Sequence, residues 1–452
     1  MRRFIIEQSD VEITSHSGLA LVGMALNRHC DLTAKVDRHI PLRRHGIPHS
    51  DVLRSLIGLL CLGKSDFDAV ENVRKDAFFA TAMGISKVPS AVTLRQRLDE
   101  RADDFRPWVE EAAAGLLVGL DVRPKALATG HVPLDADVTP FDNSNTRKEG
   151  VSRTYQGCDG YAPMAAYLGQ EGYALEFELR AGSQHCQRGT PEFLRRVLPR
   201  ARRVTEQPLL LRLDGGNDAL ENIDCVLDFN EAESRRNPRA RGVDFIIKWN
   251  PRQEDPNHWL AHAERHARFT TPRPGKRVAV FDVKVRRERK GSQYALRRVM
   301  RVVERTLDRK GQVLLIPEIE IEGWWTSLDL APGKIIKLYA DHGTAEQFHS
   351  EFKTDLAVER LPSGKFSTNA VVLACAVLAY NILRYLGQKG LTGPGAPLRH
   401  RAVRRRIRTV IQELMYRAAR VVESGRRLKL AFGRHCRIVP IFDTLYQRLA
   451  WT

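Results

Sequence analysis

The order of strands and helices in residues 126–250 restricts the fold of this chain more than any other feature. Strands are expected over residues 131–138, 162–168, 173–179, 208–213 and 243–249, and helices over 190–197 and 219–229. Gly169-Gln170-Glu171-Gly172 separates the second and third strands and is typical of a hairpin connection. Because the strands first follow one another directly and then alternate with helices, the pattern predicts an α/β core with a mixed sheet.

The segments around this core differ from it in character. Residues 277–285 and 296–303 alternate apolar and basic residues, which predicts antiparallel strands with basic outward faces. Residues 366–386 are apolar on nearly all sides, which predicts a buried helix. We therefore divide the chain into a helical N-terminal DNA-binding domain (1–125), a first part of the core (126–250), a β-rich insertion (251–320), a second part of the core (321–388) and a basic C-terminal region (389–452).

The charge of the chain indicates a polyanionic partner. The 72 Lys and Arg residues exceed the 54 Asp and Glu residues, which gives a formal net charge of +18. Nucleic acid is the first candidate for such a partner and a membrane surface the second. The longest apolar run, 370–378, is short for a membrane span, so we expect no membrane partner.

The seven cysteines are widely spaced and contain no CxxC pair, which fits a reducing cytoplasm and argues against a zinc module. The two His-Cys dipeptides, His185-Cys186 and His435-Cys436, are interpreted as incidental because no partner pair has ligand spacing.

Carboxylates at two strands and one helix are the candidate catalytic residues. Asp135 and Asp137 lie two apart on one strand and therefore point to the same face. Asp214 ends a strand and precedes Gly215-Gly216, and Glu346 lies in the first turns of a helix that we expect to begin at Thr344. Oxygen ligands on neighbouring strands and a facing helix suit two Mg²⁺ ions that act in phosphoryl transfer. Taken singly, an aspartate at a strand end is more often a turn residue.

Basic residues in two other segments have two interpretations each. Ser90 caps a helix that exposes Arg95 and Arg97, which fits either a helix-turn-helix element or a bundle helix with a solvated basic face. Residues 399–437 contain Arg404, Arg405 and Arg406 in a dense basic run. That run either contacts DNA phosphates, which we favour, or forms a solvated helix face.

The spacing Tyr339-x2-His342-x3-Glu346-x6-Lys353 resembles the Y-(2)-R-(3)-E-(6)-K signature of DDE transposases from bacterial insertion sequences, with His342 in place of arginine and Gln347 in place of asparagine. Other segments resemble the insertion-sequence thirteen-eighty group (DDE transposase group 1): residues 134–139, 211–216, 325–328, 358–362 and 378–381, with 89–94 and 419–427 near the two ends.

The resemblance implies an RNase H-like catalytic core interrupted by the β-rich insertion, with Asp137, Asp214 and Glu346 as the DDE triad. Asp137 is preferred because Asp137-x-Thr139 resembles the D-x-T form of the first strand, and Asp135 stays a rival on the same face. The ligands of Mg²⁺, or of Mn²⁺ in its place, would be Asp137, Asp214 and Glu346, with Asp135 as the rival of Asp137. Tyr339, His342 and Lys353 would contact the DNA backbone near the cleaved phosphate.

The expected function is that of a bacterial, cytoplasmic DNA transposase. It would bind the terminal inverted repeats of its own element as a homodimer, cleave DNA with metal ions and join the ends to target DNA. Two alternatives remain: a catalytically inactive, transposase-derived DNA-binding repressor, and an RNase H-like nuclease without strand transfer.

Overall fold

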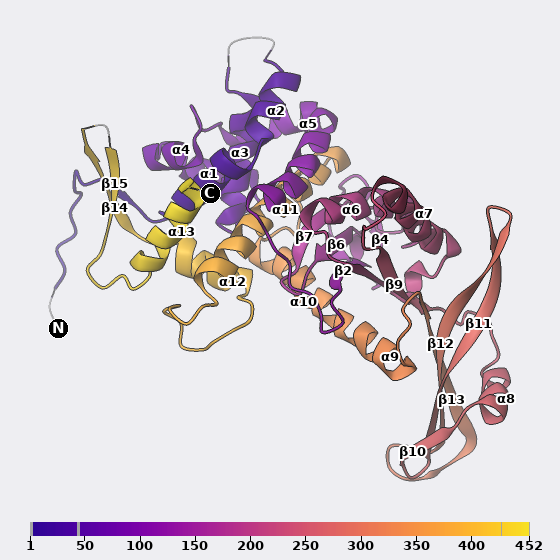
Figure 1. The fold of residues 1–452 in the computed structure, drawn as a ribbon. Coiled ribbons are helices and arrows are strands. Elements are labelled where there is room, and N and C mark those ends of the chain that lie inside the picture. Colours follow the sequence, from indigo (N-terminus) through magenta and orange to yellow (C-terminus); the bar gives the residue numbers. More distant parts are fainter. Residues whose placement is uncertain (1–2, 43–45, 426, 452) are drawn as a thin grey trace.

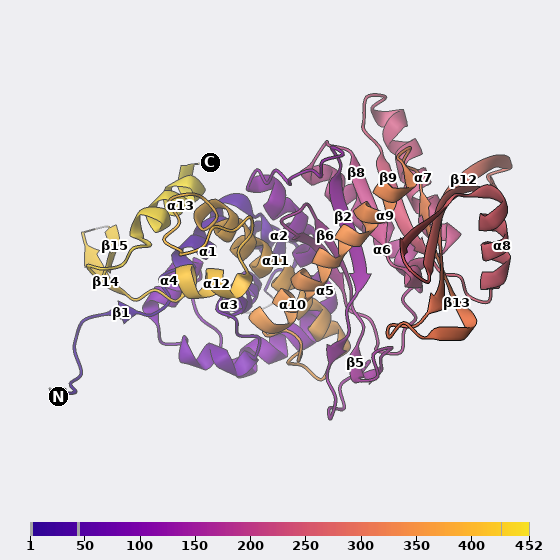
Figure 2. The ribbon, with the colours of Figure 1, turned by 90° about the horizontal axis from the view of Figure 1, so that it is seen from below.

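In a computed structural model, which describes residues 3–42, 46–425 and 427–451, the centre of the chain is one nine-stranded mixed sheet (Figures 1 and 2). In spatial order its strands are β10 (Phe269–Arg273), β11 (Lys276–Arg289), β12 (Ser292–Leu307), β13 (Val313–Thr326), β9 (Val243–Trp249), β8 (Leu209–Leu213), β2 (Val132–Val138), β6 (Met164–Leu168) and β7 (Tyr173–Glu178). The neighbours β2, β8 and β9 are parallel, and the other pairs are antiparallel. The predicted α/β class with a mixed sheet is confirmed.

The strands β2, β6, β7, β8 and β9 are those expected from the sequence. The predicted hairpin is the pair β6–β7, with Gly169 and Gly172 both at positive φ, a conformation that glycine adopts readily. Helices α6 (Thr190–Val204) and α7 (Leu220–Arg236) connect β7 to β8 and β8 to β9. Both are longer than expected: the buried face of α6 continues to Ala201, whereas the last turns of α7, residues 230–236, add no buried residue.

The insertion extends the core sheet and does not form a separate layer. Strands β11 and β12 pair along their length, as predicted, and project from the core as a long twisted ribbon (Figure 1). Strand β13 returns to the core, where residues 323–326 pair with residues 246–249 of β9. Helix α8 (Pro256–His266) packs against the ribbon.

The N-terminal part is helical, as predicted. It contains α1 (Leu19–His29), α2 (Leu32–His39), α3 (His49–Cys61), a 3₁₀ turn (Phe67–Asn72), α4 (Ala77–Met83) and α5 (Ala91–Gly119). The predicted cap of α5 is confirmed, since the Thr93 backbone N–H donates to Ser90 Oγ at 3.1 Å.

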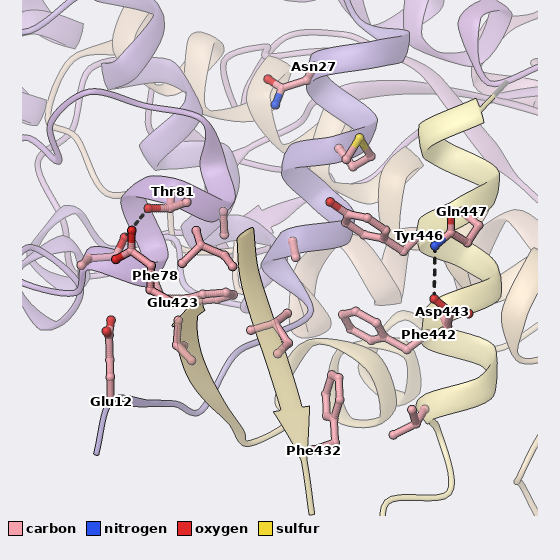
Figure 3. Close-up of a pocket in the computed structure, with 18 of the residues that line it drawn as sticks. Glu12, Asn27, Phe78, Thr81, Glu423, Phe432, Phe442, Asp443, Tyr446 and Gln447 are labelled. Atoms are coloured by element: carbon pink, nitrogen blue, oxygen red, sulfur yellow. Dashed lines mark hydrogen bonds between the residues drawn. The ribbon is translucent and has the colours of Figure 1, made fainter. Parts of the chain in front are cut away.

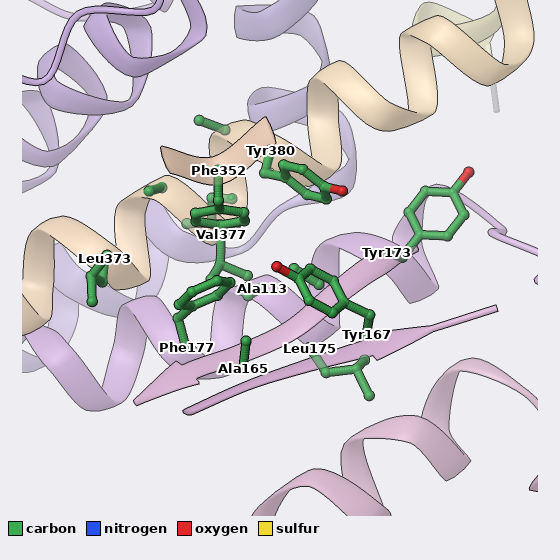
Figure 4. Packing of buried hydrophobic residues seen from close by; sticks show 14 of the residues in the cluster. Ala113, Ala165, Tyr167, Tyr173, Leu175, Phe177, Phe352, Leu373, Val377 and Tyr380 are labelled. Carbon is green, nitrogen blue, oxygen red and sulfur yellow. The ribbon is translucent and has the colours of Figure 1, made fainter. Parts of the chain in front are cut away.

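Helix α11 (Phe366–Gly390) joins the helical part to the sheet. It packs against α3, α5 and β7, and is buried along nearly its whole length. By length and composition it is apolar enough to cross a membrane, but 89% of its most apolar window is buried, which confirms the predicted core helix. Figure 4 shows its Tyr380 beside Phe352, whose ring stacks on Phe177 of β7 with the centroids 4.1 Å apart.

The two ends of the chain form one structural unit that the sequence analysis did not predict. Strand β1 (Ile13–Thr14) pairs with β14 (Ala419–Ser424), which pairs with β15 (Arg427–Phe432). Helix α13 (Val439–Trp451) packs against α1 and α11, and α12 (Ile407–Val410) continues into a π-helical turn (Ile411–Met415). The interpretation of the basic run as one solvated helix face is therefore wrong for most of its length, because alternating residues such as Leu428 and Leu430 form a strand.

A second three-stranded sheet consists of β3 (Phe141–Asp142), β5 (Asp159–Tyr161) and β4 (Ser152–Arg153).

The helix that carries Glu346 is one part of a longer helical run that was not expected from the sequence. Helix α9 (Pro332–Ala340), a 3₁₀ turn (Asp341–Gly343), α10 (Thr344–Ser350) and a π-helical turn (Glu351–Asp355) follow one another without a break. Gly343 has right-handed helical geometry, and Thr344 Oγ1 donates to the carbonyl of Asp341 at 3.1 Å. Helix α10 thus begins at Thr344, as predicted, but the predicted capping role of Thr344 is wrong, because its hydroxyl bonds to the preceding turn and α9 already leads into α10.

Candidate active site at the ends of two parallel strands

Two of the predicted carboxylates lie side by side because of the register of β2 and β8. These strands are parallel, and residue 135 pairs with 212 and residue 136 with 213. One further step in this register brings Asp137, near the end of β2, beside Asp214, which directly follows β8. Burial, and then the negative charge of Asp137, raise the pKa of Asp214 above its ordinary value.

The side chains of Asp137 and Asp214 contact few positively charged groups. Among the described residues, no Lys or Arg forms an ion pair with Asp137 or Asp214. Asp137 Oδ1 accepts a hydrogen bond from the Val138 backbone N–H at 2.7 Å, and Asp214 Oδ1 accepts one from Asn217 Nδ2 at 2.6 Å. The strand ends therefore hold a concentration of negative charge that the protein itself leaves largely uncompensated.

Asp135, the rival of Asp137, has opposite surroundings. Its side chain is only 3% exposed and binds Arg212 through two hydrogen bonds, of 2.6 and 2.7 Å. His342 Nδ1 lies 3.1 Å from Asp135 Oδ1. Burial alone would raise the pKa of Asp135, but the charges of Arg212 and His342 outweigh it and lower this pKa. Asp135 is thus a neutralised carboxylate that ties β2 to β8 and to the helical run.

Glu346 lies on the helix face that is turned toward β2. His342, one turn earlier, contacts Asp135, and His349, one turn later, lies 3.7 Å from Asp137 (Nε2 to Oδ2). The Glu346 side chain is itself exposed. No three His, Cys, Asp or Glu side chains in the described part of the chain are grouped closely enough to hold a metal ion. The structure thus brings Asp137 and Asp214 together, and leaves Glu346 nearby without joining it to them.

The other signature residues surround the same strand ends. Burial, then the charges of Asp214 and Asp137, raise the pKa of Tyr339. The pKa of His342 is also raised: burial acts against this, but Asp135 outweighs it. This histidine therefore keeps positive charge to higher pH than an ordinary one, as the arginine of the signature would. Lys353 lies in the π-helical turn, 5.8 Å from the Phe141 ring, and burial lowers its pKa.

A family model described as "Transposase DDE domain group 1" matches residues 3–452. The chain belongs to this transposase family. No curated protein matches it. Among solved structures it is similar to one described as "Cryo-EM structure of piggyBac transposase synaptic complex with hairpin DNA", with a TM-score of 0.39 and 9% identity over 97% of this chain and 82% of that chain.

In this DDE transposase-family chain, the predicted DNA-binding arginines of the C-terminal region contact the protein itself. Arg404 pairs with Glu351 of the π-helical turn and donates to Gln347 Oε1 at 2.8 Å. Arg406 binds the Asp355 carboxylate at 2.9 Å, and Arg405 Nε donates to the Leu391 carbonyl at 2.7 Å. Their contact with DNA stays a prediction, and the structure gives Arg404 and Arg406 a role in holding the helix that carries Glu346.

The predicted N-terminal DNA contacts lie on helix α5, which has 29 residues and packs along α11. Arg95 is exposed and lies 3.7 Å from Asp68, and Arg97 Nη1 lies 3.0 Å from His49 Nδ1. This packing agrees with the second interpretation, a bundle helix with a solvated basic face. Base recognition by Arg95 and Arg97 stays a prediction.

Three residues at the strand ends of this transposase-family site were not predicted from the sequence. His349, three residues after Glu346, has its Nδ1 3.2 Å from the Tyr167 hydroxyl, while its buried Nε2 has no hydrogen-bond partner in the described part of the chain. Tyr155 donates to the Val138 carbonyl at 3.4 Å, and burial together with Asp137 and Asp214 raises its pKa to about 12. The helical spacing of His349 from Glu346 was a usable signal, but nothing local in the sequence points to Tyr155 or Tyr167.

Proposed function

We propose that this chain is a DNA transposase that binds the terminal inverted repeats of its own element, cleaves the DNA there and joins the freed ends to target DNA. The observation that carries the proposal is the pair Asp137 and Asp214, uncompensated at the ends of parallel strands in a chain of the DDE transposase family. The strand order β7-β6-β2-β8-β9 supports an RNase H-like core around this pair. The resemblance to the insertion-sequence thirteen-eighty group belongs to the same proposal.

The carboxylates fit hard divalent cations. Asp137 and Asp214 offer oxygen ligands, and burial, then the charge of Asp137, raise the pKa of Asp214, which a bound cation would offset. We propose that they hold Mg²⁺, or Mn²⁺ in its place, with Glu346 as a further ligand and two ions in each site. Such ions would stabilise charge on the attacking and leaving oxygens of the phosphoryl transfer.

The surrounding residues have proposed roles of their own. Asp135 and Arg212 fix the register that places Asp137 beside Asp214. His342, kept positively charged by Asp135, is suited to a DNA phosphate, as is Lys353. His349 lies where its Nε2 can orient the Asp137 carboxylate. DNA ends and target DNA would be bound by a homodimer in the bacterial cytoplasm, at the nucleoid.

The test compares DNA binding with DNA cleavage by purified protein and a DNA fragment that carries the ends of the element. We expect Asp214→Asn and Glu346→Gln to abolish Mg²⁺-dependent cleavage and to leave end binding largely intact. Because the Glu346 side chain is exposed, we expect Glu346→Gln to fold normally. Full cleavage by either variant would overturn the assignment of that residue.

A second candidate is a catalytically inactive, transposase-derived DNA-binding protein. The observation in its favour is that Glu346 is not grouped with Asp137 and Asp214. Tight end binding by the unaltered protein without cleavage in Mg²⁺ or Mn²⁺ would favour it. A strand-transfer assay with precleaved ends distinguishes a transposase from a nuclease that cuts without joining.

A further inference from the structure

A groove lies between the two ends of the chain (Figure 3). The elements that line it lie at the opposite end of the ribbon from β2 and β9 (Figure 1). Its volume is about 940 Å³, and its walls come from α1, α4, β14, β15 and α13. Most of the lining is apolar, including Met24, Phe78, Leu428, Leu430, Phe432 and Phe442. The volume and lining are those of a site that binds a small ligand or a few side chains.

The charge of the groove is opposite to that of the whole protein. Among the described residues that line it, the charged ones are Glu12, Glu423 and Asp443, and none is Lys or Arg. None of these three carboxylates forms an ion pair with a residue that the structure describes. In a chain of net charge +18, such a groove selects a segment with apolar side chains next to positive charge.

The first residues of the chain have that chemistry. The sequence begins Met1-Arg2-Arg3-Phe4-Ile5-Ile6, so two arginines precede three large apolar residues. Phe4, Ile5 and Ile6 are 90%, 91% and 96% exposed. Three consecutive apolar side chains left in solvent indicate a surface that another surface covers.

We propose that the groove receives the N-terminal arm, residues 1–6, of a second copy of this chain, and that two copies exchange their arms. The described part of the arm leads away from its own copy in both views of the ribbon (Figures 1 and 2) and leaves the groove open. Arm and groove lie close together on one copy, because Glu12, at the base of the arm, also lines the groove. A single two-fold axis therefore satisfies both contacts at once.

The arm exchange needs neither DNA nor the carboxylates of the active site. Its failure would leave the proposed catalysis untouched, and a failure of catalysis would leave the arm exchange untouched. Other occupants, such as the arm of the same copy, are outcomes of the test below.

The direct test places the photo-reactive residue p-benzoylphenylalanine at position 5 of the full-length protein. This protein is mixed with a longer, tagged copy that lacks the probe, irradiated without DNA and digested for mass spectrometry. We expect adducts between the two copies, on peptides that contain Leu430 and Phe442. Adducts within one copy, or no adducts in the groove, would overturn the proposal. The matched control has the probe at Leu315 in the insertion, which is 99% exposed, and should give no groove adducts.

Charge and apolar variants test the same contact by a second route. Phe4→Asp with Ile5→Asp alters only exposed side chains and should convert dimers to monomers in light scattering, with an unchanged melting temperature. Glu423→Arg with Asp443→Arg reverses the charge of the groove and should lower the cross-link yield at least severalfold. An unchanged molar mass of the Phe4→Asp, Ile5→Asp variant, and an unchanged cross-link yield of the Glu423→Arg, Asp443→Arg variant, would contradict the exchange.

Discussion

The core contains two acidic pairs whose surroundings are opposite. Asp137 and Asp214 lie at strand ends with no Lys or Arg partner among the described residues, and their mutual repulsion contributes to the raised pKa of Asp214. Glu351 and Asp355 lie on the π-helical turn, with side chains 3% and 0% exposed, and arginines surround both.

Each pair has its own consequence for stability and chemistry. Arg384 binds Glu351 at 2.6 Å and Arg406 binds Asp355 at 2.9 Å, so this negative charge is used to join the helical run to α11 and the C-terminal region. At the strand ends no Lys or Arg among the described residues pairs with the negative charge, which a ligand could therefore use. A buried, compensated carboxylate therefore serves the fold, and an uncompensated one is a candidate for metal chemistry.

The largest expected effect is a loss of stability when the carboxylate of Glu351 is removed. Glu351→Gln leaves the Arg384 guanidinium, 1% exposed, without its carboxylate, and should lower the free energy of unfolding by about 3–5 kcal/mol. Chemical denaturation of the full-length protein measures this loss. Glu346→Gln is the matched control on the same helical run and should change stability by no more than about 0.5 kcal/mol. Equal stability of the two variants would contradict the structural role of Glu351.

The next largest effects are expected to differ between variants of Asp137 and Asp135, the two aspartates of β2. Asp137→Asn should reduce cleavage of element ends by about 10²–10³-fold or more, with little loss of stability, because it removes a charge that we propose binds the metal ions. Asp135→Asn should destabilise the protein, because Arg212 then lacks its buried carboxylate. Cleavage rates and denaturation curves measured on both variants check the contrast, and reversed phenotypes would make Asp135 the triad member.

A smaller effect on cleavage is expected from His349, which lies next to Asp137. His349→Ala removes the ring next to Asp137 and should lower cleavage by about 10–100-fold, as expected for a residue that orients a metal ligand. The measurement is the Mg²⁺ concentration needed for half-maximal cleavage, which should rise. Tyr167→Phe, which removes only the hydroxyl that contacts His349, should have a weaker effect in the same direction. An unchanged Mg²⁺ requirement in His349→Ala would contradict the positioning role.

The smallest effect concerns pH. Because the pKa of Asp214 is raised in the folded protein, the folded state binds a proton more readily than the unfolded state. Stability therefore falls as the pH rises from the ordinary carboxyl pKa of 3.8 through the raised value. In metal-free buffer Asp214→Asn should melt a few degrees higher than the unaltered protein at neutral pH, and no higher at pH well below 3.8. A lower melting temperature at neutral pH would show that Asp214 is compensated after all.

The sequence predicted the sheet better than it predicted the site. Alternating and apolar runs identified β2, β6, β7, β8 and β9, because each strand buries its side chains in a local pattern. The joining of β1 to β14 was not predictable, because the two strands lie about four hundred residues apart and β1 has only two residues.

Within the site, the choice between Asp135 and Asp137 depended on a resemblance, since both point to one face of β2. The structure separates them by a partner on another strand, Arg212, which spacing alone does not pair with Asp135. The role of Glu351 was equally hidden, because its arginines come from α11 and from residues more than fifty positions away.

The central claim is that Asp137 and Asp214 form the uncompensated cation site of this chain. Binding of Mn²⁺ to the DNA-free protein, measured by calorimetry at neutral pH, tests it most directly. We predict that the unaltered protein binds Mn²⁺, that Asp214→Asn loses most of this binding, and that Arg95→Gln, on helix α5 beside Asp68, keeps it. Equal Mn²⁺ binding by Asp214→Asn and the unaltered protein would contradict the claim.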